Sequence, residues 1–333
     1  MLNILPKIDS SWLIPTVPFC ASRHSYKRQQ PNITPISRNK AIESSDRFPL
    51  WDIEKRIHLV RALESQSRSA PDTYLTGVTA ALWYGFSVLT ARTDIEFLVT
   101  CKHHRRSTTA GSHCRYFKGC SVHRRRHRLP REAYSQVKGV RIITPKFLLF
   151  EVLQAPNVYS ALVTGDSIFR FLLRKYGDPR TLLDSTIERL RNSLLRVAQS
   201  LPHNVDKKRI LSRTHLLSAK SESPLETITR LRLREAGVPK PRQQRFVRAN
   251  GQTYYADFAW DRQKTVLEVD GKSKYRDNPQ RKITQQNARE EQMTAKYPYL
   301  YRSGWHEVLS DSFIQLVRSW FPQRALRPPR AIE

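Results

Sequence analysis

The stretch TYYADFAWDRQKTVLEVD, residues 253–270, decides the fold of the C-terminal part of the chain. Its two outer runs, Thr253 to Trp260 and Thr265 to Asp270, are rich in aromatic and β-branched residues, which favour strands. The polar residues DRQK (261–264) between them predict the turn of a β-hairpin. A turn of this length pairs Trp260 with Thr265, and the pairing then continues residue by residue away from the turn.

The register of this hairpin brings two acids together. Counting from the turn, Asp257 lies directly opposite Glu268, with Cβ atoms roughly 5 Å apart on one side of the sheet. Alternation along the strand puts Asp270 on the same side as Glu268. Opposed carboxylates repel each other and destabilise a sheet unless a cation lies between them. The register therefore predicts a metal site at Asp257 and Glu268, with a purely structural pairing of the two acids as the alternative.

Mg²⁺ is the cofactor that such a site favours, with Mn²⁺ as a substitute. Mg²⁺ binds one or two carboxylates and keeps several of its waters. It can activate a water molecule and stabilise charge on a phosphoryl oxygen. Lys272 and Lys274 follow within four residues of Asp270, and either lysine can stabilise the developing charge or orient the attacking water. Both lysines can equally be ordinary surface charges.

A helix is predicted immediately before the hairpin. Ser223 is its N-cap, Pro224 occupies its first position, and Glu226 stands where a capping box places its acid. Gly237 ends the helix, and two prolines follow closely. The simplest role of Glu226 is that of a capping residue. The simplest role of Asp270 is to begin the Asp-Gly turn at the end of its strand.

Five segments carry a resemblance to a known family: SPLETITRLRLREAGVPKP (223–241), YYADFAW (254–260), VLEVDGKSKY (266–275), a basic helix around Arg289-Glu290, and GWHEV (304–308). With that order and spacing, the run from Ser223 to Trp305 resembles the restriction-endonuclease-like fold of the PD-(D/E)XK superfamily. Within that superfamily it is most similar to the very-short-patch-repair-endonuclease-like domains. The resemblance implies that Asp257 and Glu268 bind the metal and that Glu226 is an accessory acid. It also implies that Arg289 contacts nucleic acid.

The chain departs from the superfamily pattern at one position. The pattern has a lysine two residues after the second acid, and this chain has Asp270 there. We count Asp270 among the candidate catalytic residues and expect Lys272 or Lys274 to supply the positive charge. The function implied is a metal-dependent DNA endonuclease that hydrolyses phosphodiester bonds. The alternative is a catalytically inactive DNA-binding regulator or antitoxin-like protein that keeps the nuclease fold as a binding platform.

Residues 46–201 form a first structured region. Hydrophobic spacing predicts helices at Asp52–Leu63, Leu75–Phe86, Pro145–Leu153, Ser167–Tyr176 and Thr181–Leu201, and strands at Asp94–Thr100 and Gly139–Ile143. Within this region, TYLTGVTAALWYGF (73–86) and VRIITPKFLLFEVL (140–153) resemble the N-terminal region of abortive-infection type IV antitoxins. The resemblance implies a winged-helix-like DNA-binding unit, and it admits a cognate toxin as a partner.

The charge balance indicates a polyanionic partner. The chain has 58 Lys and Arg residues against 29 Asp and Glu residues, a formal net charge of +29. Such an excess attracts nucleic acid, because neutralised phosphates release counterions, and it favours DNA as the partner. RNA remains open as a substrate. No membrane partner is expected, because neither a basic amphipathic anchor nor a lipidation signal is visible.

A basic segment at residues 101–131 stands out within the first region, because it has ten Lys or Arg residues and no Asp or Glu. We interpret it as a strand-and-loop stretch in which Arg124, Arg125 and Arg126 reach phosphates. A solvated charged loop is one alternative. A zinc site is the other, although no tight C-x2-C pair is present; its candidate ligands are Cys101, Cys114, Cys120, His123 and His127.

Together these patterns predict an α/β (α+β) chain of several parts. They are a mobile basic arm (1–45), the winged-helix-like region (46–201), a linker (202–222), a nuclease-like domain with a mixed sheet flanked by helices (223–322), and a loose basic tail (323–333). Four cysteines argue against a disulfide framework, and prolines interrupt the N-terminal apolar stretch, so no signal peptide is expected. We expect a soluble cytoplasmic protein whose oligomeric state the sequence does not define.

Overall fold

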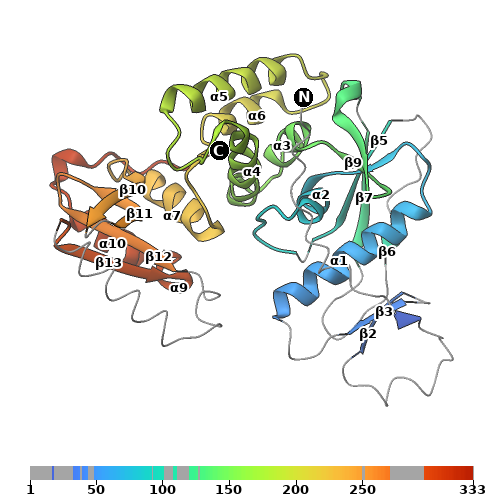
Figure 1. Ribbon diagram of the computed structural model, residues 1–333, viewed down its shortest axis with the longest axis horizontal. Coiled ribbons are helices and arrows are strands. Elements are labelled where there is room, and N and C mark those ends of the chain that lie inside the picture. Colours follow the sequence, from blue (N-terminus) through green and yellow to red (C-terminus); the bar gives the residue numbers. More distant parts are fainter. Residues whose placement is uncertain are drawn as a thin grey trace. The chain divides into compact units, whose positions relative to one another are not determined.

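The computed structural model describes residues 17–18, 33–37, 40–43, 49–91, 93–100, 108–110, 120–126, 128–249, 252–270 and 296–332. The chain is a mixed α/β protein with two mixed sheets flanked by helices, and it divides into two compact units (Figure 1). Unit 1 comprises residues 1–156 and 191–215, and unit 2 comprises residues 157–190 and 216–333. Each unit therefore combines two separate stretches of the chain.

Unit 1 is built on a mixed sheet that has six strands among the described residues. In spatial order these are β6 (Thr108–Ala110), β7 (Cys120–Arg126), β5 (Ile95–Val99), β4 (Thr73–Leu75), β9 (Val140–Ile143) and β8 (Tyr134–Val137). The β5–β7 and β4–β9 pairs are parallel, and the other neighbours are antiparallel. The strands predicted around β5 and β9 are confirmed.

The helices of unit 1 are α1 (Leu50–Ser67), α2 (Gly77–Tyr84), α3 (Pro145–Leu153), α6 (Lys207–Thr214) and the second half of α5 (Asp184–Gln199). The helix predicted over 145–153 is confirmed as α3. The helix predicted from Leu75 begins later, because Leu75 ends strand β4 and Gly77, with φ +55°, opens α2. The segment expected to be a linker contains α6. The largest fully buried apolar side chains here are Ile57, Leu75, Trp83, Phe97, Phe147 and Phe150.

Short strands also occur in the segment expected to be an arm without regular structure. They are β1 (Val17–Pro18), β2 (Ile33–Ser37) and β3 (Lys40–Glu43). The three form an antiparallel sheet in the order β1-β3-β2. The sequence missed them because they lack a sustained apolar alternation.

Unit 2 is built on a sheet in which β10 (Arg242–Ala249), β11 (Gln252–Trp260), β12 (Thr265–Asp270) and β13 (Tyr299–Gly304) follow one another in space. The β10–β11 and β11–β12 pairs are antiparallel, whereas β12 and β13 are parallel. Trp260 pairs with Thr265 across the turn, so the predicted hairpin and its register at the turn are confirmed.

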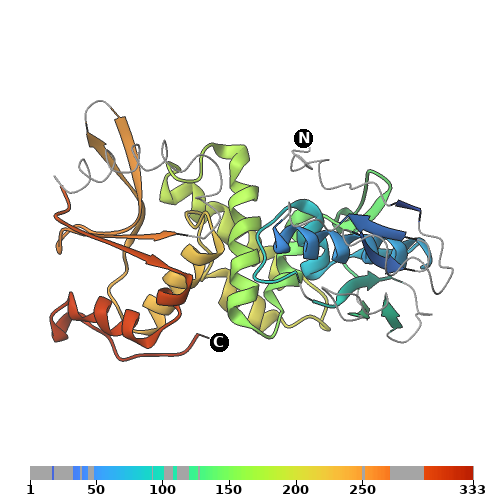
Figure 2. The ribbon, with the colours of Figure 1, turned by 90° about the horizontal axis from the view of Figure 1, so that it is seen from below.

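Among the described residues, unit 2 also contains the first half of α5 and helices α4 (Val158–Leu173), α7 (Pro224–Glu235), α9 (Trp305–Val308) and α10 (Asp311–Ser319). The end of α10 packs on the sheet, because the ring of Trp320, directly after α10, stacks on Tyr301 of β13 and meets Trp260 of β11 edge-on. Figure 2 shows the C-terminal helices, in red, beside the strands of unit 2. The helix predicted at 167–176 is the second half of α4 followed by a 3₁₀ turn. No helix in the described part of the chain is long and apolar enough to cross a membrane.

Helix α4 is fastened to α7 through one buried acid. Asp166 on α4 is 1% exposed and forms an ion pair of 2.8 Å with Arg230 of α7. It also accepts hydrogen bonds from the Thr227 hydroxyl (2.9 Å) and the Ser218 backbone N–H (2.7 Å). Residues 157–190 therefore belong to the same unit as the predicted nuclease-like domain. The sequence predicted them as part of the first region, because they lie far from that domain along the chain.

The C-terminal tail is attached rather than loose. The Arg327 N–H donates to the Gly237 carbonyl (2.9 Å), and the Arg330 N–H donates to the Glu235 carbonyl (2.8 Å). These bonds satisfy carbonyl groups at the C-terminal end of α7, because the last carbonyls of a helix have no donor within the helix. Gly237 has φ +68°, and a Cβ at this position would lie 2.0 Å from the Arg327 carbonyl oxygen. The expected looseness was wrong because composition does not reveal a backbone partner.

Gly237→Ala is expected to destabilise unit 2 and release the tail. The left-handed conformation costs an alanine about 1–2 kcal/mol, and the contact with Arg327 adds to that cost. Limited proteolysis should remove the tail faster, and chemical denaturation should show the lower stability. Gly85→Ala is the matched control, since Gly85 has φ +75° and open space around its Cβ position. Equal losses in the two variants would contradict the steric account.

Candidate functional site

Three acids of unit 2 are buried, two on the sheet and one on α7. Asp257 of β11 is 8% exposed, Glu268 of β12 is 4% exposed, and Glu226 of α7 is 5% exposed. The paired residues of β11 and β12 end at Phe258 and Leu267, one step before the two strand acids. At that step the Asp257 carboxylate accepts a hydrogen bond of 2.9 Å from the Val269 N–H. Asp257 thus reaches the backbone of the strand that carries Glu268.

Gln244 of β10 joins two of these acids. Its side-chain amide donates to the Glu226 carboxyl at 3.1 Å and lies 3.5 Å from an Asp257 oxygen. The residue is buried, and its φ of +49° is rare for a side chain of this kind inside a strand. Backbone strain of this type concentrates at functional sites. Sequence reasoning missed Gln244, because a glutamine in a polar strand gives no signal of its own.

Glu226 has an altered ionisation. Burial, followed by the negative charge of Asp257, raises the pKa of Glu226 to about 8. Ser223 is the N-cap, as predicted, and its hydroxyl accepts from the Glu226 N–H. The Glu226 side chain, however, accepts from the N–H of Glu222 (2.9 Å), one residue before the cap. Glu226 therefore stabilises the helix start and also belongs to the acid cluster.

Glu226→Gln is expected to remove a pH dependence of stability. The carboxyl has a folded-state pKa of about 8 against an ordinary value of 4.5, so the folded chain holds a proton that the unfolded chain has lost. Stability therefore falls as pH rises from 4.5 towards 8, by at most about 1.4 kcal/mol per unit. Urea denaturation at pH 5 and pH 8, run in parallel, measures this slope.

Between pH 5 and pH 8, the free energy of unfolding should fall less for the glutamine variant than for the parent protein, because the amide carries no charge at either pH. Asp311→Asn serves as the control, since that side chain is 97% exposed and lies in the same unit. A slope that persists unchanged in Glu226→Gln would show that another group carries it.

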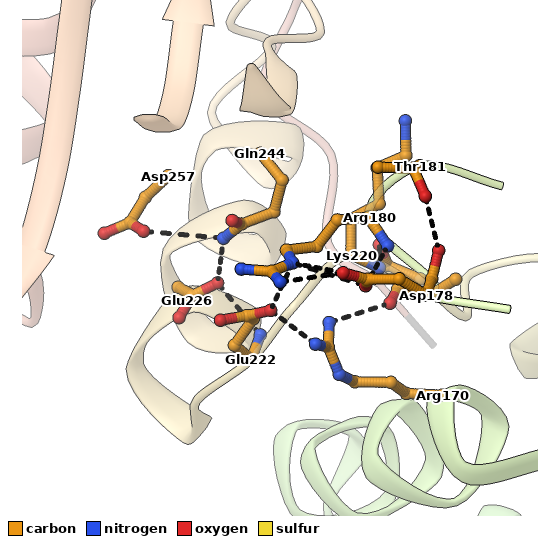
Figure 3. A network of polar contacts seen from close by, with 11 residues as sticks. Arg170, Asp178, Arg180, Thr181, Lys220, Glu222, Glu226, Gln244 and Asp257 are labelled. Carbon is orange, nitrogen blue, oxygen red and sulfur yellow. Dashed lines mark hydrogen bonds and ion pairs between the residues drawn. The ribbon is translucent and has the colours of Figure 1, made fainter. Parts of the chain in front are cut away.

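A network of ion pairs holds the segment in front of Glu226 (Figure 3). Arg170 of α4 donates to the Glu222 carboxylate, and Arg180 lies 3.7 Å from the same group. Arg180 is in turn paired with Asp178 at 2.7 Å. These contacts lower the pKa of the Asp178 carboxyl, chiefly through the hydrogen bond from Arg180. Residues 170–180 thus fix the backbone that supports the acid cluster.

The remaining candidates at the end of β12 divide into two groups. Asp270 lies 3.9 Å from the Arg302 guanidinium of β13, and Arg302 itself is in register with Glu268. Lys272, Lys274 and Arg289 lie outside the described residues. Among the residues that are described, no group of three or more His, Cys, Asp or Glu side chains is arranged to hold a metal ion. Asp257, Glu268 and Glu226 thus do not form such a group in the described part of the chain.

The three arginines at the end of strand β7 in unit 1 differ in their contacts and exposure. Arg125 forms an ion pair of 2.8 Å with Glu96, a half-buried acid whose pKa is raised by desolvation. The Arg124 guanidinium lies over the Phe97 ring at 5.8 Å. Arg126 is exposed. Arg125, one of the three arginines expected to reach phosphates, thus forms an ion pair within its own unit.

The zinc alternative has only part of its ligands in the described chain. Cys101, Cys114 and His127 lie outside the described residues. Cys120 is buried, and burial raises the pKa of its thiol. His123 contacts Asp94 at 2.9 Å.

Protein-family models, curated proteins and solved structures all yield no match to this chain.

Proposed function

We propose that unit 2 is a metal-dependent DNA endonuclease with a restriction-endonuclease-like fold. The observation that carries the proposal is the buried cluster of Glu226, Gln244 and Asp257 beside Glu268. Burying several carboxylates together is costly, since like charges in a poorly solvated site repel each other. A fold that bears this cost at one place gains from it when the acids serve a cation and a reaction.

The strand acids suit Mg²⁺ or Mn²⁺. Asp257 and Glu268 supply carboxylate oxygens, the ligands that these hard cations prefer, and Mg²⁺ needs only one or two of them. When bound, the cation would acidify a water molecule and stabilise charge on the phosphodiester. Gln244 orients the Asp257 and Glu226 carboxyls through its amide. Glu226, which holds a proton near neutral pH, can exchange that proton with solvent at the site.

Lys272 or Lys274 completes this proposal as the source of positive charge. Each follows Asp270 closely in sequence, at the end of the strand that carries Glu268. Asp270 itself is engaged with Arg302. In this scheme Asp270 has a positioning role, and the lysine acts on the developing phosphoryl charge.

Unit 1 would supply affinity for DNA as an antitoxin-like, winged-helix-like half, and a cognate toxin would be a further partner. The support for this proposal is the net charge of +29 of the whole chain and the exposed Arg126 on β7. Phosphate contacts of this kind give binding that weakens steeply with salt. Arg289 would add a further nucleic-acid contact.

A cleavage assay tests the proposal. Supercoiled plasmid is incubated with the whole protein in Mg²⁺ or Mn²⁺, and in parallel with EDTA. We expect nicked or linear products only with the metal. Cleavage in EDTA would refute a metal-dependent reaction.

The second candidate function, a DNA-binding regulator, is favoured by Asp270 at the position of the motif lysine. In that case the plasmid stays intact in either metal while salt-sensitive DNA binding persists. Binding is measured on the same preparation, so an inactive but folded regulator is told apart from a damaged nuclease.

A further inference from the structure

We infer that one face of the β10–β11 hairpin binds a single strand of DNA, with Phe246 stacking on an unpaired base. This inference rests on the proposed function for the choice of DNA as ligand. The surface, which we call the hairpin face, consists of Phe246 and Arg248 on β10, Thr253 and Tyr255 on β11, and Arg180 beside them. All of these residues belong to unit 2.

The strand register places these side chains together. Phe246 pairs with Tyr255, and Arg248 pairs with Thr253, so that paired residues share one face of the sheet. Val247, between Phe246 and Arg248, points to the opposite side and is buried in an apolar cluster with Ala256 and Val266. At Phe246 and Arg248 the hairpin face is therefore the exposed side of β10, while the opposite side holds the apolar cluster. In Figure 1, β10 and β11 run next to each other.

Phe246 has the exposure of a binding residue. Its side chain is 52% exposed, although a phenylalanine in a strand gains most when it is covered. One guanidinium group lies near each aromatic ring. Arg245, which pairs with Asp261, lies 5.4 Å from the centre of the Phe246 ring, and Arg180, which pairs with Asp178, lies 4.6 Å from that of Tyr255. Aromatic rings interleaved with arginines are the surface that single-stranded nucleic acid uses, with bases on the rings and phosphates on the cations.

The hairpin face also leads to the acid cluster. One side of β11 carries Thr253, Tyr255 and Asp257 in alternation. On β10, Gln244 precedes Phe246 by two residues and contacts Asp257. Two residues of a strand span about 7 Å. A DNA strand lying along this face would therefore reach the acids within a short distance. An apolar protein partner fits less well, because the exposed Arg248 shares the face with Phe246.

Binding without catalysis tests this inference. The whole protein is titrated in EDTA against a fluorescent single-stranded DNA oligonucleotide and against the same sequence as a duplex. The salt concentration is raised enough to weaken phosphate contacts elsewhere on the chain. Phe246→Ala should weaken single-strand binding about 5-fold to 100-fold, in line with the loss of one stacked base, and should affect duplex binding much less. Its salt dependence should stay that of the parent protein.

Matched variants separate stacking from general surface effects. Tyr299→Ala removes an aromatic side chain that is 58% exposed at the other edge of the same sheet, and it should bind like the parent. Arg248→Gln should lower the affinity and reduce the slope of log affinity against log salt by about 0.7. Arg262→Gln, at the turn beyond β11, should change that slope less.

Two results would overturn the inference: Phe246→Ala binding no worse than Tyr299→Ala, or equal losses for single-stranded and duplex DNA. Tighter, Phe246-dependent binding of RNA would overturn the assignment to DNA. The plasmid assay is scored separately. An inactive protein whose single-strand binding needs Phe246 contradicts the nuclease alone, and an active one indifferent to Phe246 contradicts the hairpin face alone.

Discussion

Asp257→Ala is expected to abolish metal-dependent cleavage, with a rate loss on the order of 10³-fold or more. Removal of a single preorganised charge-stabilising group already costs an enzyme 10²-fold to 10³-fold. Asp257 additionally contacts Gln244, which bonds the Glu226 carboxyl, and the backbone of β12, so its loss disturbs these neighbours as well. The measurement is the initial rate of plasmid cleavage in saturating Mn²⁺. Glu268→Ala should give a loss of the same order.

The controls for this prediction separate chemistry from folding. Asp257→Asn keeps the shape and the hydrogen bond to Val269 while removing the charge, and it should be as inactive as the alanine variant. Asp311→Asn removes an exposed carboxylate of the same unit and should cleave normally. Circular dichroism and thermal melting confirm that each protein is folded. Cleavage that survives in both the Asp257 and the Glu268 variants would place the reaction elsewhere or trace it to a contaminant.

Asp166→Ala is expected to cost about 3–5 kcal/mol of stability in unit 2, the usual cost of leaving one partner of a buried ion pair alone. The variant removes the carboxylate partner of the Arg230 guanidinium, and it leaves the Thr227 hydroxyl and Ser218 N–H without their acceptor. Folded domains are stable by only about 5–15 kcal/mol, so a loss of this size brings unit 2 close to unfolding. Chemical denaturation followed by tryptophan fluorescence measures the change.

A compensating pair of changes checks the cause. Replacing Asp166 by leucine and Arg230 by methionine together should recover much of the loss, because apolar residues of similar volume often replace a buried ion pair without harm. Asp311→Ala, which breaks an exposed contact with Arg232, should change stability by less than about 1 kcal/mol. A double variant no better than Asp166→Ala would mean that packing at α4, rather than charge, is responsible.

Local patterns of the sequence predicted the hairpin well. The turn at 261–264 and the pairing of Trp260 with Thr265 follow from alternation and polar punctuation, which act over a few residues. The start of α7 at Ser223 followed from capping chemistry for the same reason. Asp257 and Glu268 are both buried, but the paired residues of β11 and β12 end one step before them, so their direct pairing stays a prediction.

Features that depend on distant contacts escaped prediction. The left-handed backbone of Gln244 and its bridge between Glu226 and Asp257 require three separate elements to meet. An amphipathic helix such as α4 shows that it packs, but its sequence does not show what it packs against. The interior partner of Arg125 could not be predicted either, because Glu96 lies on a neighbouring strand far from it in sequence.

The interleaving of the two units has a consequence for synthesis on the ribosome. Residues 157–190 of unit 2 leave the ribosome before residues 191–215, which complete unit 1. Helix α4 must therefore wait for α7, with Asp166 unpaired until Arg230 is made. Contacts between residues so far apart form slowly. A nascent chain stalled before residue 230 should hold α4 exposed to chaperones and proteases, and a fragment beginning at residue 223 should lack the partner that steadies its first helix.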